Sequence, residues 1–394
     1  MEPFYKTHLH LVENVNSSVR RLLMDEIDWT KRLIGIKGSR GVGKTTFLLQ
    51  FAKERFGAID RDCLYVNFNN FYFAGHSLTE FAEEFYNKGG QVLLLDQLFK
   101  YENWSKELRY CYDTFPNLQI VFTGSSVMRL VEDNEDLQDI ITPYHLRGFS
   151  FREYLNLQTG LSLKSYTLTE ILSDHERIAE RICKTVNPLV HFASYLHHGY
   201  YPFYLENRNY SENLLKTMNM MLEVDILLIK QIDIKYLSKI RKLLYIILEN
   251  SPSSLNVSQL SDEIETSRLT VMNYIKYLQD ARLINLLYTA GESFPKKPKM
   301  LYLQNTNLMH ALSIKEVDKD NEAKTFLYNT LQYRHRINLG KQQGDFFVDN
   351  LFNIKYLKSE AGKNKPAMKL VFAVDNMLVG YRNKIPLWLF GFLY

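Results

Sequence analysis

The sequence is poor in several residue types and patterns that mark special classes of protein. Its 394 residues include only 18 glycines and 10 prolines, which excludes a collagen-like or low-complexity chain. The three cysteines, Cys63, Cys111 and Cys183, are too widely spaced for a zinc knuckle or a disulfide framework, and they fit a reducing compartment. Residues 1–16 hold no apolar signal core, and the apolar run 387–394 is too short to span a bilayer. We therefore expect a cytoplasmic protein with no membrane partner.

Charge is nearly balanced over the whole chain but not along it. Lys and Arg number 48 against 44 Asp and Glu, a net charge of +4 that by itself argues for no polyanion. Residues 291–394 hold 16 Lys and Arg against 9 Asp and Glu, or +7, which leaves −3 for residues 1–290. This asymmetry indicates DNA or RNA as a partner, with a solvated basic surface as the alternative.

The first part of the sequence alternates between helical and strand patterns. A helix is expected over 17–28, another over 44–55, and a third after the capping-box pair Ser77 and Glu80, running to Tyr86. Apolar runs of strand length lie at 32–37, 63–68, 92–96 and 119–123. Continuous apolar runs fit strands buried on both faces, so residues 1–150 are predicted to form a parallel sheet covered by helices. The strand ending at 122–126 is expected between the strands ending at Gly38 and Asp96.

Beyond Phe151 the pattern changes to helices, and we expect three further domains. Residues 151–240 are predicted to be a helical lid or linker, 241–290 a winged helix-turn-helix, and 291–394 a separate C-terminal domain. The helix expected over 267–281 offers the polar groups Arg268, Asn273 and Lys276. Because 241–290 carries 5 Lys and Arg and 5 Asp and Glu, this segment suits a protein contact as well as DNA.

One motif in the chain carries specific chemistry. Residues 38–45 read G-x-x-x-x-G-K-T between a predicted strand and a predicted helix, the pattern of a phosphate-binding P-loop, with a chance glycine-rich turn as the alternative. Its backbone N–H groups converge on phosphate oxygens, and its lysine neutralises the β- and γ-phosphates. The predicted phosphate-binding residues are Gly38, Ser39, Arg40, Gly41, Val42, Gly43, Lys44, Thr45 and Thr46.

A P-loop needs a second metal anchor and a group that acts on the attacking water. We expect Thr45 and Asp96 to hold Mg²⁺, because Asp96 ends a buried strand. The catalytic group is predicted to comprise Lys44, Asp96, Gln97 and Ser125. Gln97 can orient a water but accepts no proton, so we predict tight binding of a nucleoside triphosphate with Mg²⁺ and slow turnover. Ser125 is the candidate γ-phosphate sensor, with an ordinary strand-end cap as the alternative.

The motifs at 38–45, 95–97, 100–104, 122–126 and 148–154, with Asn383–Trp388, resemble a family of bacterial and archaeal AAA+-related ATPases. The resemblance implies an α/β P-loop NTPase sheet of the additional-strand, AAA+-like type. An all-α region with a winged helix and an α+β C-terminal domain like PD-(D/E)xK nucleases would follow. It also implies ATP binding, ATP hydrolysis and a link to nucleic acid.

The chain departs from this family at functional positions. Gln97 stands where members have Glu, and the arginine that usually precedes the Ser-Phe-Arg-Glu motif at 150–153 is absent. Arg129 or Arg147 is a candidate substitute, although a surface position is expected for each. Charge stabilisation of a transferring phosphoryl group therefore loses its usual source.

The C-terminal domain offers a set of nuclease-like candidates. A metal-dependent nuclease would use Asp345, Glu360 and Lys363, although Lys324 occupies the place of the family's helical glutamate. Three functions stay open: a slow ATPase switch, an ATP-holding regulator that binds DNA, a protein partner or a second copy of itself, and an ATP-gated nuclease.

Overall fold

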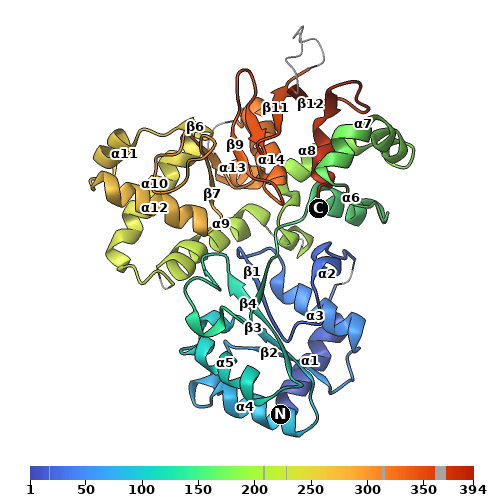
Figure 1. Ribbon diagram of the computed structural model, residues 1–394, viewed down its shortest axis with the longest axis vertical. Coiled ribbons are helices and arrows are strands. Elements are labelled where there is room, and N and C mark those ends of the chain that lie inside the picture. The colour runs from blue at the N-terminus through green and yellow to red at the C-terminus, as the bar shows by residue number, and fades with distance from the viewer. Residues whose placement is uncertain (17, 207–208, 228, 313–315, 360–369) are drawn as a thin grey trace. The chain divides into compact units, whose positions relative to one another are not determined.

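The computed structural model describes residues 1–16, 18–206, 209–227, 229–312, 316–359 and 370–394. The chain divides into two compact units, residues 1–148 and 149–394 (Figure 1). The finer domain boundaries at 240 and 290 stay predictions. Within the described residues no helix combines the length and the apolar character that a membrane crossing requires.

Unit 1 is built on a parallel sheet whose strands run in the order β2-β3-β4-β1-β5. The predicted position of β4 between β3 and β1 is confirmed. The strands are β1 (Leu33–Gly38), β2 (Cys63–Asn67), β3 (Val92–Asp96), β4 (Gln119–Ser125) and β5 (Thr142–His145). Because every strand is parallel to its neighbours, the carboxyl ends of all of them meet at one edge of the sheet.

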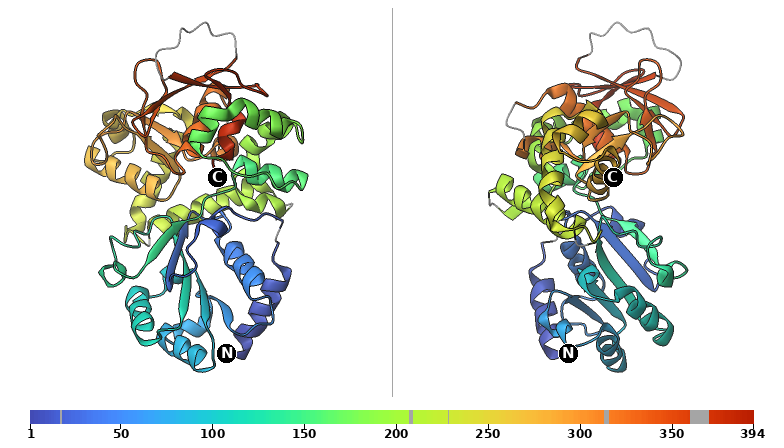
Figure 2. Two further views of the ribbon diagram at one scale, coloured as in Figure 1. Left: turned by 45° about the vertical axis from the view of Figure 1, so that its right-hand side comes forward. Right: turned by 90° about the vertical axis from the view of Figure 1, so that its left-hand side faces the viewer.

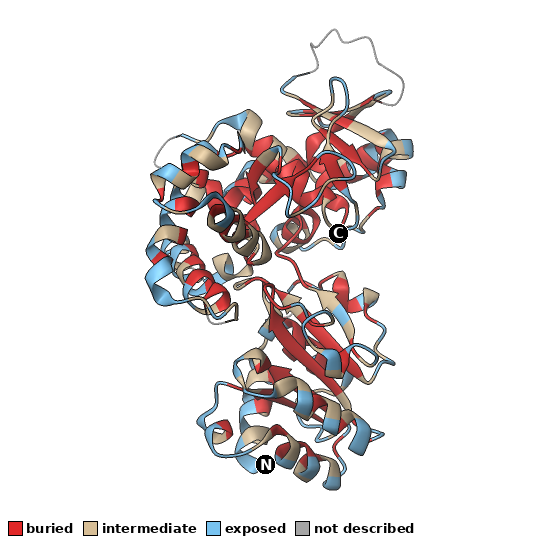
Figure 3. Ribbon diagram, turned by 60° about the vertical axis from the view of Figure 1, so that its left-hand side comes forward, coloured by how far each residue is buried: buried red, intermediate tan, exposed pale blue. Residues whose placement is uncertain are grey.

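Helices cover both faces of this sheet, and its central strands are buried (Figure 3), which explains why their residues are apolar on both sides. Helices α1 (Glu2–Asn14) and α3 (Lys44–Arg55) contact each other and β2. Helices α4 (Leu78–Asn87) and α5 (Trp104–Thr114) pack together on the opposite face (Figure 2). The Ser77–Glu80 capping box at the start of α4 is present as predicted.

The helix expected over 17–28 is wrong for most of its length. Helix α2 covers only Leu23–Glu26, and Ser17 lies outside the described residues. The preceding segment is non-helical because its carbonyl groups have other partners: the Gln50 side chain donates to the Asn16 and Val19 oxygens at 2.8 and 3.1 Å. Apolar periodicity does not reveal such a side-chain contact from a distant helix.

Helix α1 was not expected, and it covers the edge strand of the sheet. His8 is 1% exposed, and its Nδ1 accepts a hydrogen bond from the Tyr65 backbone N–H at 2.9 Å. An edge strand otherwise leaves such N–H groups unpaired. Burial lowers the pKa of His8 to about 4, so the ring is neutral at pH 7.

Unit 2 begins with helices and ends with a mixed sheet. The helices are α6 (Phe151–Thr159), α7 (Leu168–Cys183), α8 (Pro188–Ser194), α9 (Tyr210–Met220), α10 (Leu237–Asn250), α11 (Val257–Glu263), α12 (Arg268–Asp280), α13 (Thr306–Leu312) and α14 (Lys319–Leu331). A small antiparallel sheet in the order β6-β8-β7 joins β6 (Ser253–Ser254), β8 (Met300–Leu303) and β7 (Ile284–Leu287).

The larger sheet of unit 2 runs in the order β13-β12-β11-β10-β9. Its strands are β9 (Ile337–Leu339), β10 (Phe346–Val348), β11 (Phe352–Leu357), β12 (Leu370–Val374) and β13 (Lys384–Pro386). One hydrophobic core joins this sheet to the first helices of the unit, because Phe151 packs with Phe326 and Trp388 in a single cluster. The Arg152 Nε atom donates to the Tyr394 carbonyl oxygen at 3.0 Å, which ties α6 to the last residue.

The neutral, buried His8 predicts that the chain loses stability in mild acid. Unfolded histidine binds a proton near pH 6.5, whereas folded His8 does so only near pH 4, so the unfolded state gains protons first. The free energy of unfolding of unit 1 should fall between these values, by at most about 3 kcal/mol. The measurement is a series of urea titrations across this pH range. The His8→Asn variant keeps an acceptor for the Tyr65 N–H but has no titrating ring, so its free energy of unfolding should fall less with pH. An unchanged slope would contradict the assignment.

Candidate functional site

The predicted P-loop lies where β1 ends and α3 begins. Gly38 is the last residue of β1, paired in register with Ser125 of β4, and Lys44 is the first residue of α3. Gly43 has φ +92°, a left-handed conformation that favours glycine. At Gly38 a Cβ atom would lie 2.4 Å from the Leu146 carbonyl oxygen, so no side chain fits there. The loop therefore has the tight strand-to-helix turn that its motif predicts.

Two cations bond the carbonyl groups of this loop. The Lys44 ammonium donates to the Gly38 and Ser39 oxygens at 2.8 and 2.9 Å. The buried Arg21 guanidinium donates to the Val42 oxygen at 3.0 Å, and also to the Arg147 and Gly148 oxygens at 2.5 and 3.1 Å. Arg21 was not expected in the site, since no residue of the helix expected over 17–28 was singled out as functional.

The Asp96 carboxylate lies at the centre of a cluster of hydroxyl groups and is 1% exposed. Thr45 donates to its Oδ2 atom at 2.6 Å, and Tyr65 donates to the same atom at 2.9 Å. Thr123 donates to Oδ1 at 2.5 Å. The structure thus brings together Thr45 and Asp96, the two predicted metal anchors, and adds Tyr65 and Thr123, which the sequence did not single out.

Gln97 and Ser125, the other predicted catalytic residues, lie at the same edge of the sheet. Gln97 has φ +59°, and its backbone N–H donates to Thr123 Oγ1 at 2.9 Å. The Ser125 hydroxyl accepts from the Val127 N–H at 3.3 Å, the contact expected of a strand-end cap. The roles of these side chains toward a nucleotide stay predictions.

The two arginines considered as substitutes differ in exposure. The Arg129 side chain is half exposed, and its Nη1 atom lies 3.6 Å from Asp133 Oδ1. Arg147 is 6% exposed, so its expected surface position is wrong. Its burial follows from the adjacent Leu146, whose N–H donates to the Lys37 oxygen and draws this segment against β1.

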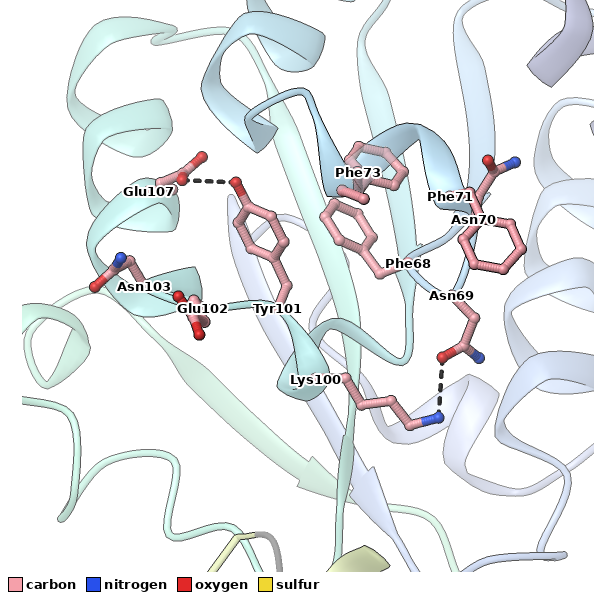
Figure 4. Close-up of a pocket in the computed structure, with 11 residues that line it drawn as sticks. Phe68, Asn69, Asn70, Phe71, Phe73, Lys100, Tyr101, Glu102, Asn103 and Glu107 are labelled. Carbon is pink, nitrogen blue, oxygen red and sulfur yellow. Dashed lines mark hydrogen bonds between the residues drawn. The ribbon is translucent and has the colours of Figure 1, made fainter.

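A hollow of about 510 Å³ lies at the same edge of the sheet, beyond β2 and β3 (Figure 4). Lys100 Nζ donates to Asn69 Oδ1 at 2.9 Å across it, and the Tyr101 hydroxyl donates to Glu107 at 2.8 Å. Its lining includes Phe68 and Phe73 but no P-loop residue. The motif at 100–104 therefore shapes this hollow rather than the phosphate loop.

Of the three nuclease-like candidates the structure describes one, Asp345, so their grouping stays a prediction. Asp345 precedes β10; its Oδ2 atom accepts from the Tyr356 N–H at 2.8 Å, and its Oδ1 atom lies 3.5 Å from Lys324 Nζ. Glu360 and Lys363 lie outside the described residues. In the part of the chain that the structure describes, no three or more His, Cys, Asp or Glu side chains are placed to hold a metal ion.

The residues of unit 1 fit a nucleotide with magnesium. A threonine hydroxyl and a carboxylate in contact are hard oxygen ligands of the kind that Mg²⁺ takes, so Thr45 and Asp96 would hold the metal. The positive end of α3 and the Lys44 ammonium suit the anionic phosphates. The parallel sheet, the loop and the helix are together those of an AAA+-like P-loop α/β domain.

Comparison with known families supports this class. Residues 30–155 match a family model described as an AAA domain, which supports an AAA+-related P-loop family. Residues 190–319 match a model described as a domain of unknown function. The first match contains the P-loop, Asp96 and Ser125, whereas the second says nothing about chemistry.

An uncharacterized protein of Methanocaldococcus jannaschii is 26% identical over 303 residues, which are 72% of this chain and 64% of that protein. The chain thus spans less than two thirds of this curated relative. The structure of the Aeropyrum pernix ORC1 protein in complex with DNA aligns with TM-score 0.31 and 12% identity, covering 78% of this chain and 91% of that chain. C. elegans PCH-2 aligns with TM-score 0.24 and 15% identity, over 71% and 66%. Scores this low carry no argument about function.

The double role of Thr123 predicts a stability effect. Thr123→Val keeps the shape of this buried side chain but removes the donor to Asp96 and the acceptor for the Gln97 N–H. We expect the free energy of unfolding to fall by about 1–3 kcal/mol in urea titrations. The control is Thr30→Val, which removes a hydroxyl donor to Asp28 in an exposed turn and should change stability far less. Equal effects would contradict the importance of the buried hydroxyl.

Proposed function

We propose that the protein binds ATP with Mg²⁺ at the P-loop of unit 1, hydrolyses it slowly and acts as a nucleotide-dependent switch. The observation that carries the proposal is the contact of Thr45 Oγ1 with Asp96 Oδ2 at 2.6 Å, beside the phosphate loop. Two side chains 51 residues apart meet where a P-loop site needs its metal anchors. The AAA-domain match over residues 30–155 supports the same assignment.

Each residue of the site has a distinct task in this proposal. The N–H groups of the loop and of the first turn of α3 bind phosphate oxygens, and Lys44 exchanges its carbonyl partners for the β- and γ-phosphates. Thr45 and Asp96 hold Mg²⁺, which when bound neutralises charge on the phosphate oxygens. Gln97 orients the attacking water, and Ser125 contacts the γ-phosphate.

Slow turnover follows from two features of the site, a glutamine at the position of the general base and an arginine that is paired elsewhere. Gln97 accepts no proton, and a missing general base typically costs a factor of about 10²–10⁴ in rate. Arg129 is paired with Asp133 at the surface, which leaves the transferring phosphoryl group without its help. The same observations favour a second candidate, a regulator that holds ATP without turnover.

Phosphate release separates these two candidates. Lys44→Ala should abolish turnover, while Lys53→Ala, near the exposed end of the same helix, should leave it unchanged. Restoring the base with Gln97→Glu should raise the rate by on the order of a hundredfold if the missing base limits the reaction. Equal rates for wild type and Lys44→Ala would refute the ATPase. An unchanged rate in Gln97→Glu would point to the missing arginine as the limit on turnover instead.

The segment from α10 to β8 has the order of elements of a winged helix, and we propose that it contacts protein rather than reads DNA. A DNA-reading helix presents several cations to the phosphates. In α12, however, Lys276 Nζ lies 2.8 Å from Asp280 Oδ1, so its charge is paired within the helix. Lys230, which precedes α10, has its Nζ atom 3.8 Å from the other oxygen of the same carboxylate. Leu269 is 72% exposed at the start of the helix, which suits an apolar partner.

DNA titrations across a salt series test this role. We expect Lys276→Ala to change the affinity for duplex DNA less than about twofold, because its charge is already neutralised by Asp280. Fluorescence polarisation with a labelled duplex measures this at low and moderate salt. A large loss of affinity in Lys276→Ala, with a weaker salt dependence, would identify α12 as a phosphate-contacting helix instead.

The nuclease alternative has no comparable support. The carboxylate of Asp345 is engaged by Lys324 and by the Tyr356 N–H, which places a cation beside the proposed metal ligand. We therefore do not extend the proposed function to a metal-dependent nuclease.

A further inference from the structure

Asp96 is a buried anion without a cationic partner among the described residues. Its carboxylate is 1% exposed, and the hydrogen bonds it receives come from the hydroxyl groups of Thr45, Tyr65 and Thr123. A buried charge is costly unless hydrogen bonds satisfy it. These three hydroxyl groups therefore stabilise the Asp96 carboxylate in the interior. They also fix the orientation of its two oxygens.

The three donors are not equivalent. Thr45 belongs to the P-loop helix and is itself a predicted metal ligand. Thr123 binds the other oxygen, Oδ1, and its hydroxyl also accepts from the Gln97 N–H. Tyr65 alone shares Oδ2 with Thr45 and has no place in the P-loop motif. Its phenol is thus the one donor that fixes the metal-facing oxygen without being a predicted ligand.

Strand geometry explains how Tyr65 reaches this position. Residue 96 pairs with Asn67 of β2, and Tyr65 lies two residues before Asn67, on the same face of the sheet. A diagonal neighbour at this spacing is within reach of an aromatic side chain. The ring is 3% exposed, and the backbone N–H of the same residue donates to the buried His8 of α1. Tyr65 is therefore held at both ends.

We propose that Tyr65 is a positioning residue for magnesium, which keeps Asp96 Oδ2 against the Thr45 hydroxyl so that both face the metal. The inference rests on the proposed function and adds to it a residue outside the P-loop and the strand that ends in Asp96. Without the phenol, the carboxylate keeps Thr123 on Oδ1 but is free to rotate Oδ2 away from Thr45. Affinity for the metal then falls, while the affinity of the loop for the phosphates does not change.

The test is Tyr65→Phe, which keeps the ring and removes one hydroxyl. Binding of ATP is measured by calorimetry in EDTA and then at increasing Mg²⁺ concentration. We expect affinity in EDTA within about twofold of wild type, and a half-saturating Mg²⁺ concentration about tenfold higher, the size of one lost hydrogen bond to a charged group. Affinity retained in EDTA also shows that the variant is folded; should it melt early, both titrations are made well below its melting temperature.

The matched control is Tyr101→Phe, which removes another phenol that donates to a carboxylate of the same unit, Glu107, at 2.8 Å. It should leave both titrations unchanged. An unchanged Mg²⁺ requirement in Tyr65→Phe overturns the inference, as does an equal loss of affinity with and without the metal, which would mean a merely structural role. If wild type binds no ATP under either condition, the proposed function itself fails, a result that is distinct from both.

Discussion

The arrangement of unit 1 depends on one buried carboxylate. Asp96 is excluded from water and satisfied by hydroxyl groups from three other elements, α3, β2 and β4. These elements bring their side chains to one point only because all the strands are parallel and end at the same edge. A different strand order would separate Thr123 from Asp96, and the anion would lose a donor that no cation among the described residues replaces. The sheet topology therefore determines whether the donors of the site reach Asp96.

The parts of this site that the sequence predicts are those with a local signal. The P-loop, the strand ending at Asp96 and the place of β4 follow from a motif of eight residues and from short apolar runs, and the topology confirms the order. Tyr65 has no such signal, because it lies in the middle of an apolar strand and looks like core. Its hydroxyl gains a role only through the pairing of β2 with β3, which depends on register rather than on any neighbouring residue.

Contacts between distant residues explain the other differences. The segment before α2 has the periodicity of a helix, yet Gln50 binds its carbonyl groups and Arg21 is drawn to the P-loop. In unit 2, Phe151 and Trp388 share one core although more than two hundred residues separate them, and Lys324 meets Asp345 across elements. Periodicity describes which face of an element is apolar but not which other element covers it. Such pairings become visible only in three dimensions.

The cations around the P-loop connect its state to the end of unit 1. Lys44 binds the loop carbonyl groups of residues 38 and 39, contacts that an anionic ligand would compete with. Arg21 binds the carbonyl group of Val42 and, through the same guanidinium, those of Arg147 and Gly148, where unit 1 ends along the chain. Leaving the donors of a buried guanidinium unsatisfied costs free energy. A displacement of the loop at Val42 would therefore also strain the hydrogen bonds of Arg21 to the carbonyl groups of residues 147 and 148. The proposed switch would require a physical link between the phosphate loop and the backbone at the end of unit 1, and the hydrogen bonds of Arg21 are a contact of this kind within unit 1.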